Sequence, residues 1–232
     1  MAVYHNLQTV FVEVSKNASN AIRRTLANDE VQYSEYSHYK WMLALEQANG
    51  NDISEYFKFI ITRNPYDRFF SAHTQMQSSM RWPKTVDQTL DWLLEKVNRS
   101  TGEPIKVVDD QGNPIPEKIE NPLNGQLQYW WDDAPPLLWP QHAFITEGTT
   151  VYVDNYYKIE DMSNQWPIIA TTINNLSGAS LPLELPVVNA QEGLPDWNSY
   201  FEGDNGQVRA NKIEQLYGKD FTMFNYETLS FE

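Results

Sequence analysis

The chain contains no cysteine among its 232 residues. That absence excludes disulfide bonds, thiolate zinc sites, iron–sulfur clusters and cysteine nucleophiles. Histidine is also scarce: His5, His38, His73 and His142 are the four present, and no two of them have the His-x-x-x-His spacing with which a helix binds zinc. We therefore expect no bound metal, and chemistry that does not depend on one.

Positive charge is in short supply as well. Seventeen Lys and Arg residues stand against 31 Asp and Glu, which gives a net charge of −14. Nucleic acids and anionic membranes are bound by clustered Lys and Arg, so we expect neither as a partner. No stretch approaches the roughly 18 apolar residues of a membrane span, and residues 1–6 lack the segments of a signal peptide. These features predict a soluble, cytoplasmic protein.

The composition does supply a core, since 41% of the residues are hydrophobic and 13% aromatic. Residues 9–14 and 56–62 are apolar and β-branched, which predicts two buried strands, and each precedes a loop and a helix. Right-handed crossovers between such units give a parallel sheet and the α/β class. The other elements predicted are helices at 21–26, 38–46, 69–80, 85–97, 164–176 and 208–217, and a strand at 151–154.

We interpret residues 1–232 as a single domain with an insertion at about 99–133. The inserted segment is rich in Gly, Pro and Asn, and residues 107–115 within it predict a short hairpin with a turn near Gly112. Long loops in compact domains are often functional. The insertion is therefore predicted to form a lid.

Both predicted strands end in loops suited to anions. A loop between a buried strand and a helix aims backbone N–H groups and the positive helix end at one point. Lys16 lies in the first loop, Arg63 ends the second strand, and Ser71 lies on the helix that follows. A guanidinium fork matches a phosphate well. The Gly-x-x-x-x-Gly-Lys-Ser/Thr motif is absent, so the loops predict a ligand with two separated anionic groups rather than a Walker A nucleotide site.

These loops carry a family resemblance. Residues 10–22, Val-Phe-Val-Glu-Val-Ser-Lys-Asn-Ala-Ser-Asn-Ala-Ile, resemble the 5′-phosphosulfate loop of the sulfotransferases, Pro-Lys-Thr-(Ala/Gly)-Gly-Thr-Ser. Residues 59–72 contain Arg-Asn-Pro-Tyr-Asp-Arg-Phe-Phe-Ser and resemble the family's 3′-phosphate motif, Arg-Asn-Pro-x-x-Arg-x-x-Ser. Weaker similarity continues through 140–141, 153–154 with 159–162, 185–189 and 216–221. The chain resembles the carbohydrate (Golgi-like, family 2) branch, in a short soluble bacterial or phage form.

The resemblance implies a P-loop-like three-layer fold, with a central parallel sheet flanked by helices. It implies 3′-phosphoadenosine 5′-phosphosulfate (PAPS) as the sulfate donor, without a metal. The implied donor-binding residues are Lys16, Asn17, Ala18, Ser19, Asn20, Ala21, Arg63 and Ser71. In the first loop Ser15 replaces the family's Pro, Asn20-Ala21 replaces its Thr-Ser, and either Ala18 or Ser19 stands where the family has Gly.

Sulfuryl transfer to a hydroxyl requires in-line attack, positive charge on the leaving oxygen and a base for the acceptor proton. We assign leaving-group stabilisation to Lys16. The alternative interpretation is that Lys16 is simply an exposed lysine of the loop. Arg63 and Ser71 are assigned to the 3′-phosphate, with pairing of Arg63 to Asp67 or Glu55 as the alternative.

His38 is the preferred base, because its pKa lies near neutrality and its position resembles that of a His in related carbohydrate enzymes. A helix-start histidine bonded to backbone is an equally good interpretation of His38. The second candidate is Glu13, a carboxylate in an apolar strand that must be perturbed or paired, for instance with Lys16.

Other residues receive weaker assignments. His73 and His142 lie in segments that border the predicted cleft, and Arg68 is interpreted as an ion-pair partner of Asp67 or Glu160. Core packing is the stronger expectation for any single aromatic residue, but some near the insertion are candidates for stacking on a sugar. These are Tyr129, Trp130, Trp131 and Trp139.

The sequence thus favours a PAPS-dependent sulfotransferase acting on a carbohydrate or small-molecule hydroxyl. A nucleotide-dependent kinase shares the anion-loop physics but needs a Mg²⁺ carboxylate and a true P-loop. A non-catalytic nucleotide-binding relative would account for the altered first loop. An acidic chain fits a neutral or small acceptor better than a highly sulfated polysaccharide.

Overall fold

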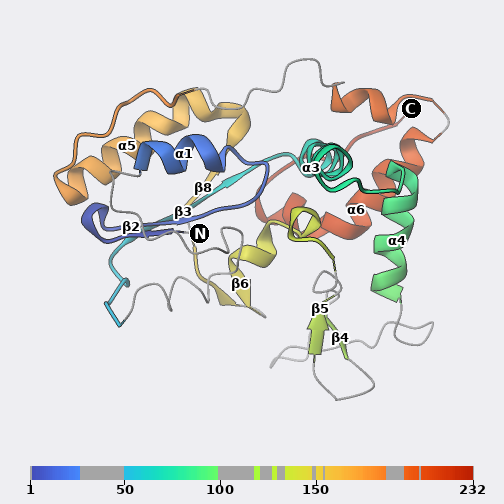
Figure 1. Ribbon diagram of the computed structural model, residues 1–232, viewed down its shortest axis with the longest axis horizontal. Helices are drawn as coiled ribbons and strands as arrows, with labels where there is room; N and C mark the ends of the chain where they lie inside the picture. The colour runs from blue at the N-terminus through green and yellow to red at the C-terminus, as the bar shows by residue number, and fades with distance from the viewer. Residues whose placement is uncertain are drawn as a thin grey trace. The chain divides into compact units, whose positions relative to one another are not determined.

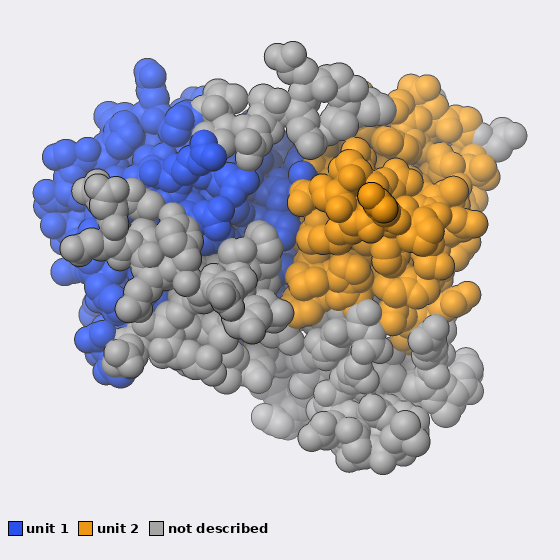
Figure 2. Space-filling view, in the orientation of Figure 1, with its two compact units in different colours: residues 1–63, 141–146, 151–194 blue, residues 64–140, 147–150, 195–232 orange. Residues whose placement is uncertain are grey.

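A computed structural model describes residues 2–26, 50–98, 118–120, 127–129, 134–147, 150–153, 155–186, 196–203 and 205–231. The chain divides into two compact units (Figure 2). Unit 1 contains residues 1–63, 141–146 and 151–194, and unit 2 contains residues 64–140, 147–150 and 195–232. Within the described ranges, no helix is both long and apolar enough to cross a membrane.

Unit 1 is built on a four-stranded sheet (Figure 1). Its strands are β1 (Ala2–Tyr4), β2 (Thr9–Val12), β3 (Phe57–Thr62) and β8 (Asn155–Lys158), in the order β1-β2-β3-β8. The pairs β2–β3 and β3–β8 are parallel, whereas β1 runs antiparallel to β2. The α/β class is confirmed, but the expected all-parallel sheet is mixed, because the short connection through the 3₁₀ helix His5–Leu7 folds the chain straight back on itself.

One face of this sheet is covered by α1 (Ser19–Leu26) and α5 (Met162–Ser177) (Figure 1). Side chains alternate along a strand, so Phe11, Phe59 and Ile61 point to the same side. There they pack into one buried cluster with residues of both helices, among them Ile22, Leu26, Trp166, Ile169 and Ile173. The predicted helices 21–26 and 164–176 are thereby confirmed, each with its apolar stripe in the core.

The strand expected at 151–154 is wrong by about four residues. Thr150–Val151 (β7) pairs with Thr146–Glu147 (β6) in a separate two-stranded sheet, and the strand that joins β3 is Asn155–Lys158. Val153 is buried but lies before that strand. The hairpin predicted at 107–115 lies outside the described residues; β4 (Lys118–Glu120) and β5 (Leu127–Tyr129) form an antiparallel pair within the same insertion.

Unit 2 contains α3 (Pro65–Met80), α4 (Val86–Asn98) and α6 (Gly206–Met223), near the ranges predicted for them. The 3₁₀ helices Pro136–Leu138 and Trp197–Phe201 belong to it as well, whereas His142–Phe144 and Ile159–Asp161 belong to unit 1. Tyr66 is central to its aromatic packing, with ring contacts to Trp197, Phe201 and Phe221.

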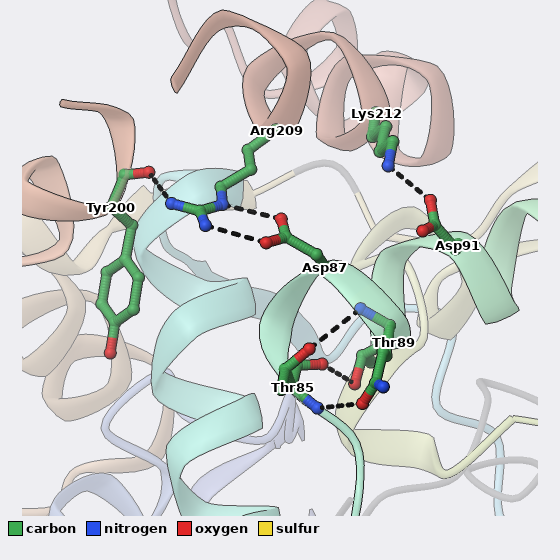
Figure 3. Close-up of polar contacts among 8 residues, drawn as sticks. Thr85, Asp87, Thr89, Asp91, Tyr200, Arg209 and Lys212 are labelled. Carbon is green, nitrogen blue, oxygen red and sulfur yellow. Dashed lines mark hydrogen bonds and ion pairs between the residues drawn. The ribbon is translucent and has the colours of Figure 1, made fainter. Parts of the chain in front are cut away.

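Ion pairs join α4 to α6 within unit 2 (Figure 3). Arg209 donates from Nε to Asp87 Oδ1 at 2.7 Å and from Nη2 to Oδ2 at 2.8 Å, a bidentate arrangement. Its Nη1 donates to the carbonyl of Tyr200 at 2.9 Å. One turn further along α4, Asp91 pairs with Lys212. We call these two ion pairs, Asp87–Arg209 and Asp91–Lys212, the α4–α6 seam. They fix the position of α4 along α6.

Candidate functional site

The first loop turns sharply between β2 and α1. Lys16 has φ 75° and Ala18 φ 58°, so two residues of the turn adopt the left-handed conformation that favours glycine. The backbone N–H of Asn17 bonds to Val14 O at 3.3 Å, and Ser19 Oγ donates to the same carbonyl at 2.7 Å. Ala18, rather than Ser19, thus has the backbone conformation of a glycine position.

This turn leads directly into the N-terminus of α1. The carbonyl of Ala18 accepts the first helical hydrogen bonds, from Ala21 N at 3.0 Å and Ile22 N at 3.2 Å. The N–H groups of the residues before them lie ahead of the intrahelical ladder, where an anion is favoured by their dipoles. Backbone amides therefore provide the anion-binding potential that the sequence predicts for this loop.

The second loop follows from the sequence Arg63-Asn64-Pro65. Arg63 directly follows β3. Asn64 is the N-cap of α3, and its side chain accepts from Tyr66 N at 3.0 Å, while Pro65 occupies the first helical turn, where its missing N–H costs nothing. Cap and proline fix where the helix starts, and Arg63 is left at the carboxyl end of the strand.

Lys16 and Arg63 meet in unit 1. Arg63 Nη1 donates to the backbone carbonyl of Lys16 at 2.9 Å. Burial lowers the pKa of the Lys16 ammonium, and the positive charge of Arg63 lowers it further. Two cationic side chains held this close repel each other, so the arrangement is suited to an anionic ligand that relieves the repulsion.

Gln141 ties both loops together, a role that the sequence does not reveal. Its side chain is fully buried. Oε1 accepts from Arg63 N at 2.9 Å and from Asn17 Nδ2 at 2.7 Å, and Nε2 donates to Arg63 O at 2.8 Å. The sequence signal was Pro140-Gln141 in the weaker part of the resemblance, but a dipeptide carries no indication of the partners it will meet.

The predicted side-chain donors of the first loop are engaged within the protein. Asn17 is fully buried, and its Nδ2 also donates to Ile61 O at 2.8 Å. Ser19 is buried and bonded to Val14 as described above. The exposed Asn20 accepts at Oδ1 from Arg23 Nη2 at 2.8 Å. These contacts hold the loop in shape, and their roles toward a ligand remain predictions.

Glu13 is buried just before the first loop, and its Oε2 lies 3.6 Å from Arg23 Nη1. Burial raises the pKa of this carboxyl, and the charge of Arg23 opposes the rise. An elevated carboxyl pKa is the direction that a general base requires. His38, the preferred base, lies outside the described residues.

Three residues with weaker assignments, His73, Arg68 and Trp139, are buried and bonded to backbone carbonyls. His73 is buried, its Nε2 lies 3.1 Å from Lys84 O, and burial lowers its pKa. Arg68 was expected in an ion pair; it is buried and donates to the carbonyls of Trp139 at 2.7 Å and Leu137 at 3.1 Å. The Trp139 ring is buried with its Nε1 bonded to Ala134 O at 2.8 Å, which removes it as a sugar platform.

The remaining predicted residues are placed only in part. His142 is buried in the 3₁₀ helix that follows Gln141. Ser71 is half-buried on α3 in unit 2, while the two cations lie in unit 1, so its contact with a 3′-phosphate remains a prediction. Trp130 and Trp131 lie outside the described residues, as does the side chain of Tyr129.

A pocket of about 610 Å³ adjoins the first loop in unit 1, a volume in the range of small-molecule sites. Ala18 and Ala21 form the side nearest the turn. The other walls come from the start of α5 and the segment that follows that helix, and the lining is Ile159, Met162, Ser163, Trp166, Leu183, Glu184, Leu185 and Pro186. The walls are mainly apolar, which suits a flat ring better than a further anion.

Residues 2–99 match a family model described as Sulfotransferase family. The matched segment is less than half of the chain and contains both loops, Lys16 and Arg63 included. The match supports sulfuryl transfer as the chemistry of this segment. No curated protein and no solved structure matches the chain.

Proposed function

We propose that the protein is a sulfotransferase that moves a sulfuryl group from PAPS to a hydroxyl of a carbohydrate or small-molecule acceptor. The observation that carries the proposal is the junction of Lys16 and Arg63. Two cations from the ends of neighbouring parallel strands share one site, joined by the bond from Arg63 Nη1 to Lys16 O. Such a site matches a ligand with two anionic groups.

Each part of PAPS would contact a different group of residues. The 5′-phosphosulfate would lie at the first turn, against the backbone amides that open α1 and against Lys16. Arg63 would bind the 3′-phosphate, and the family resemblance alone assigns Ser71 to the same phosphate. The purine would occupy the apolar pocket beside Ala18 and Ala21. One nucleotide would thereby use both loops and the pocket together.

In the transfer, the acceptor oxygen attacks sulfur in line with the phosphosulfate bridge. An oxygen–sulfur bond forms to the acceptor, the bridging sulfur–oxygen bond breaks, and the acceptor proton passes to a base. Negative charge grows on the departing phosphate oxygen, where the Lys16 ammonium stabilises it. The products are a sulfate ester and adenosine 3′,5′-bisphosphate.

His38 is proposed as the base, with Glu13 as the alternative. Glu13 is buried and lies against Arg23, so its carboxyl also has a structural role. Turnover that survives His38→Ala but not Glu13→Gln would assign the proton to Glu13. The reverse would assign it to His38.

The acceptor is proposed to be neutral or small, because a net charge of −14 disfavours a polyanion. The same balance leads us to propose that the protein binds neither nucleic acid nor an anionic membrane, and a cytoplasmic location is proposed with it.

The donor proposal is tested by thermal denaturation with added nucleotide. Adenosine 3′,5′-bisphosphate should raise the melting temperature by linkage, and ATP with Mg²⁺ should raise it less at equal concentration. Arg63→Ala should abolish most of the shift, while Lys212→Ala, in the α4–α6 seam, is the matched control that keeps it. A larger shift with ATP would favour a kinase-like enzyme. No shift with the bisphosphate contradicts the proposal.

A further inference from the structure

We propose that Gln141 is a positioning residue that sets the distance between the two anion-binding loops, and that this distance lets one bisphosphate engage both. The inference rests on the proposed donor. It concerns a residue that acts through its bonds to Asn17 and to the backbone of Arg63.

The first step is the way in which Gln141 holds the second loop. Its amide accepts from the N–H of Arg63 and donates to the carbonyl of the same residue, at 2.9 and 2.8 Å. This two-point contact is what a neighbouring strand would make with an extended residue. The backbone of Arg63 is therefore fixed in orientation, and the guanidinium starts from a defined point.

The second step is the link to the first loop. Gln141 Oε1 also accepts from Asn17 Nδ2 at 2.7 Å, and that same Nδ2 donates to Ile61 O in β3. Asn17 stands between the two left-handed residues of the turn, Lys16 and Ala18. A shift of Gln141 would thus be felt by both the turn and the strand end.

The third step is burial. Gln141 and Asn17 are both fully buried, so water does not replace these bonds when one partner is removed. A rigid spacing favours a ligand whose two anionic groups are joined covalently, because binding of the second group then costs little further translational and rotational entropy. A monophosphate has one anionic group, so the spacing does not change its affinity.

The test is calorimetric titration of three ligands: adenosine 3′,5′-bisphosphate, adenosine 5′-monophosphate and adenosine 3′-monophosphate. In the wild type the bisphosphate should bind more tightly than either monophosphate. In Gln141→Met, which loses all three bonds, that advantage should fall on the order of tenfold because the spacing of the loops is no longer fixed, while both monophosphate affinities stay within about twofold.

Gln141→Glu is the second variant, in case the methionine variant does not fold. It keeps the shape and the acceptor oxygen, and when ionised it loses the donor to Arg63 O and sets a negatively charged oxygen against that carbonyl. Its bisphosphate advantage should therefore be reduced at neutral pH and partly restored, relative to wild type, as the pH is lowered and the carboxyl regains a proton.

The outcomes separate the two proposals. If the wild type does not bind the bisphosphate more tightly than the monophosphates, the proposed function and this inference both fail. If it does, but the Gln141 variants keep the full advantage, only the inference fails. A parallel loss of affinity for all three ligands also overturns it, because that is the effect of a purely structural residue.

Discussion

Individual residues of the first loop carry the largest expected effects on activity. Lys16 combines a half-buried position, a left-handed backbone and a pKa lowered by burial and by Arg63. Its replacement should therefore act on the transfer step more than on binding, whereas replacement of Arg63 should act on binding.

Lys16→Met removes the charge and keeps the length of the side chain. We expect kcat to fall by roughly 100- to 1,000-fold, the usual effect of losing one group that stabilises transition-state charge, with a smaller change in the KM for PAPS. Arg63→Lys is the comparison, since it keeps the charge and loses the fork, and it should mainly raise that KM. Steady-state kinetics measure both. Near-normal kcat in Lys16→Met contradicts the assignment.

Ala18→Gly tests which residue occupies the glycine position of the turn. A left-handed alanine is strained, so glycine should stabilise the fold by about 1 kcal/mol. Ser19→Gly is the matched control: it removes the bond from Oγ to Val14 O and should destabilise the fold by a similar amount. Denaturant unfolding measures both. A loss of stability in Ala18→Gly would show that the φ of 58° carries no strain.

At the level of elements, short-range patterns located most of the helices and strands. The runs 9–14 and 56–62 gave β2 and β3, because buried parallel strands are continuously apolar. The strand β8 was misplaced, since Asn155, Tyr156, Tyr157 and Lys158 are half-buried and do not form an apolar run. Its position is decided by pairing with β3, which is distant in sequence.

In the site, too, residues marked by a local pattern were predicted and residues defined by distant contacts were not. Lys16 and Arg63 were identifiable because each follows a strand and precedes a helix. Gln141 was not, because its role depends on three bonds to residues that lie 78 and 124 positions away. The hydrogen bonds from Arg68 to the carbonyls of Leu137 and Trp139 could not be predicted either, because local charge carries no information about distant backbone carbonyls.

The start of α6 makes a clear prediction about glycine. A Cβ at Gly206 would lie 1.9 Å from Phe201 O, so Gly206→Ala must displace backbone and should cost about 3 kcal/mol. Gly218 follows the kink that α6 makes at Tyr217 and has nothing within 4 Å of such a Cβ, so Gly218→Ala should stabilise the fold by about 0.5–1 kcal/mol through the unfolded chain. Thermal unfolding of the two variants should shift in opposite directions; equal shifts would contradict this.

The α4–α6 seam predicts a pH dependence of stability. The hydrogen bonds from Arg209 hold the pKa of Asp87 below 3.8, its ordinary value. A carboxyl with a depressed pKa in the folded state stabilises the fold above its unfolded pKa, and loses that contribution as the pH falls through the folded value. Asp87→Asn should therefore destabilise the protein at pH 7, by at most about 1 kcal/mol for a partly exposed pair.

The difference between Asp87→Asn and the wild type should shrink when urea unfolding is repeated below about pH 3.8, because the carboxyl of the unfolded chain then takes up its proton while the folded one is still ionised. Asp91→Asn is the control, since Asp91 is more exposed and makes a single contact with Lys212. A difference that does not change as the pH falls below about 3.8 would mean that the charge of Asp87 does not stabilise the seam.

For the whole molecule, the acidic surface and the cationic site have opposite consequences. A net charge of −14 repels an anionic nucleotide at long range, so binding depends on the few cations held close together in unit 1. The effect of the ligand should accordingly be confined to the part of the chain that holds those groups.

Hydrogen exchange with and without adenosine 3′,5′-bisphosphate should show this confinement. We expect slower exchange in peptides that cover residues 14–22, 57–63 and 141–146, because ligand binding suppresses their local opening. Peptides from α4 and α6, which contribute nothing to the proposed donor site, serve as the internal control and should exchange at unchanged rates. Protection limited to α4 and α6 would place the ligand elsewhere.

The long reach of Gln141 also has a consequence for folding. Its bonds to Asn17 and Arg63 close segments of 124 and 78 residues, and contacts of such separation form late because the entropy of closing the chain must be overcome first. Residues 2–99 hold both loops but neither β8 nor Gln141. During synthesis, the two cations are therefore present long before the chain that fixes their spacing has left the ribosome.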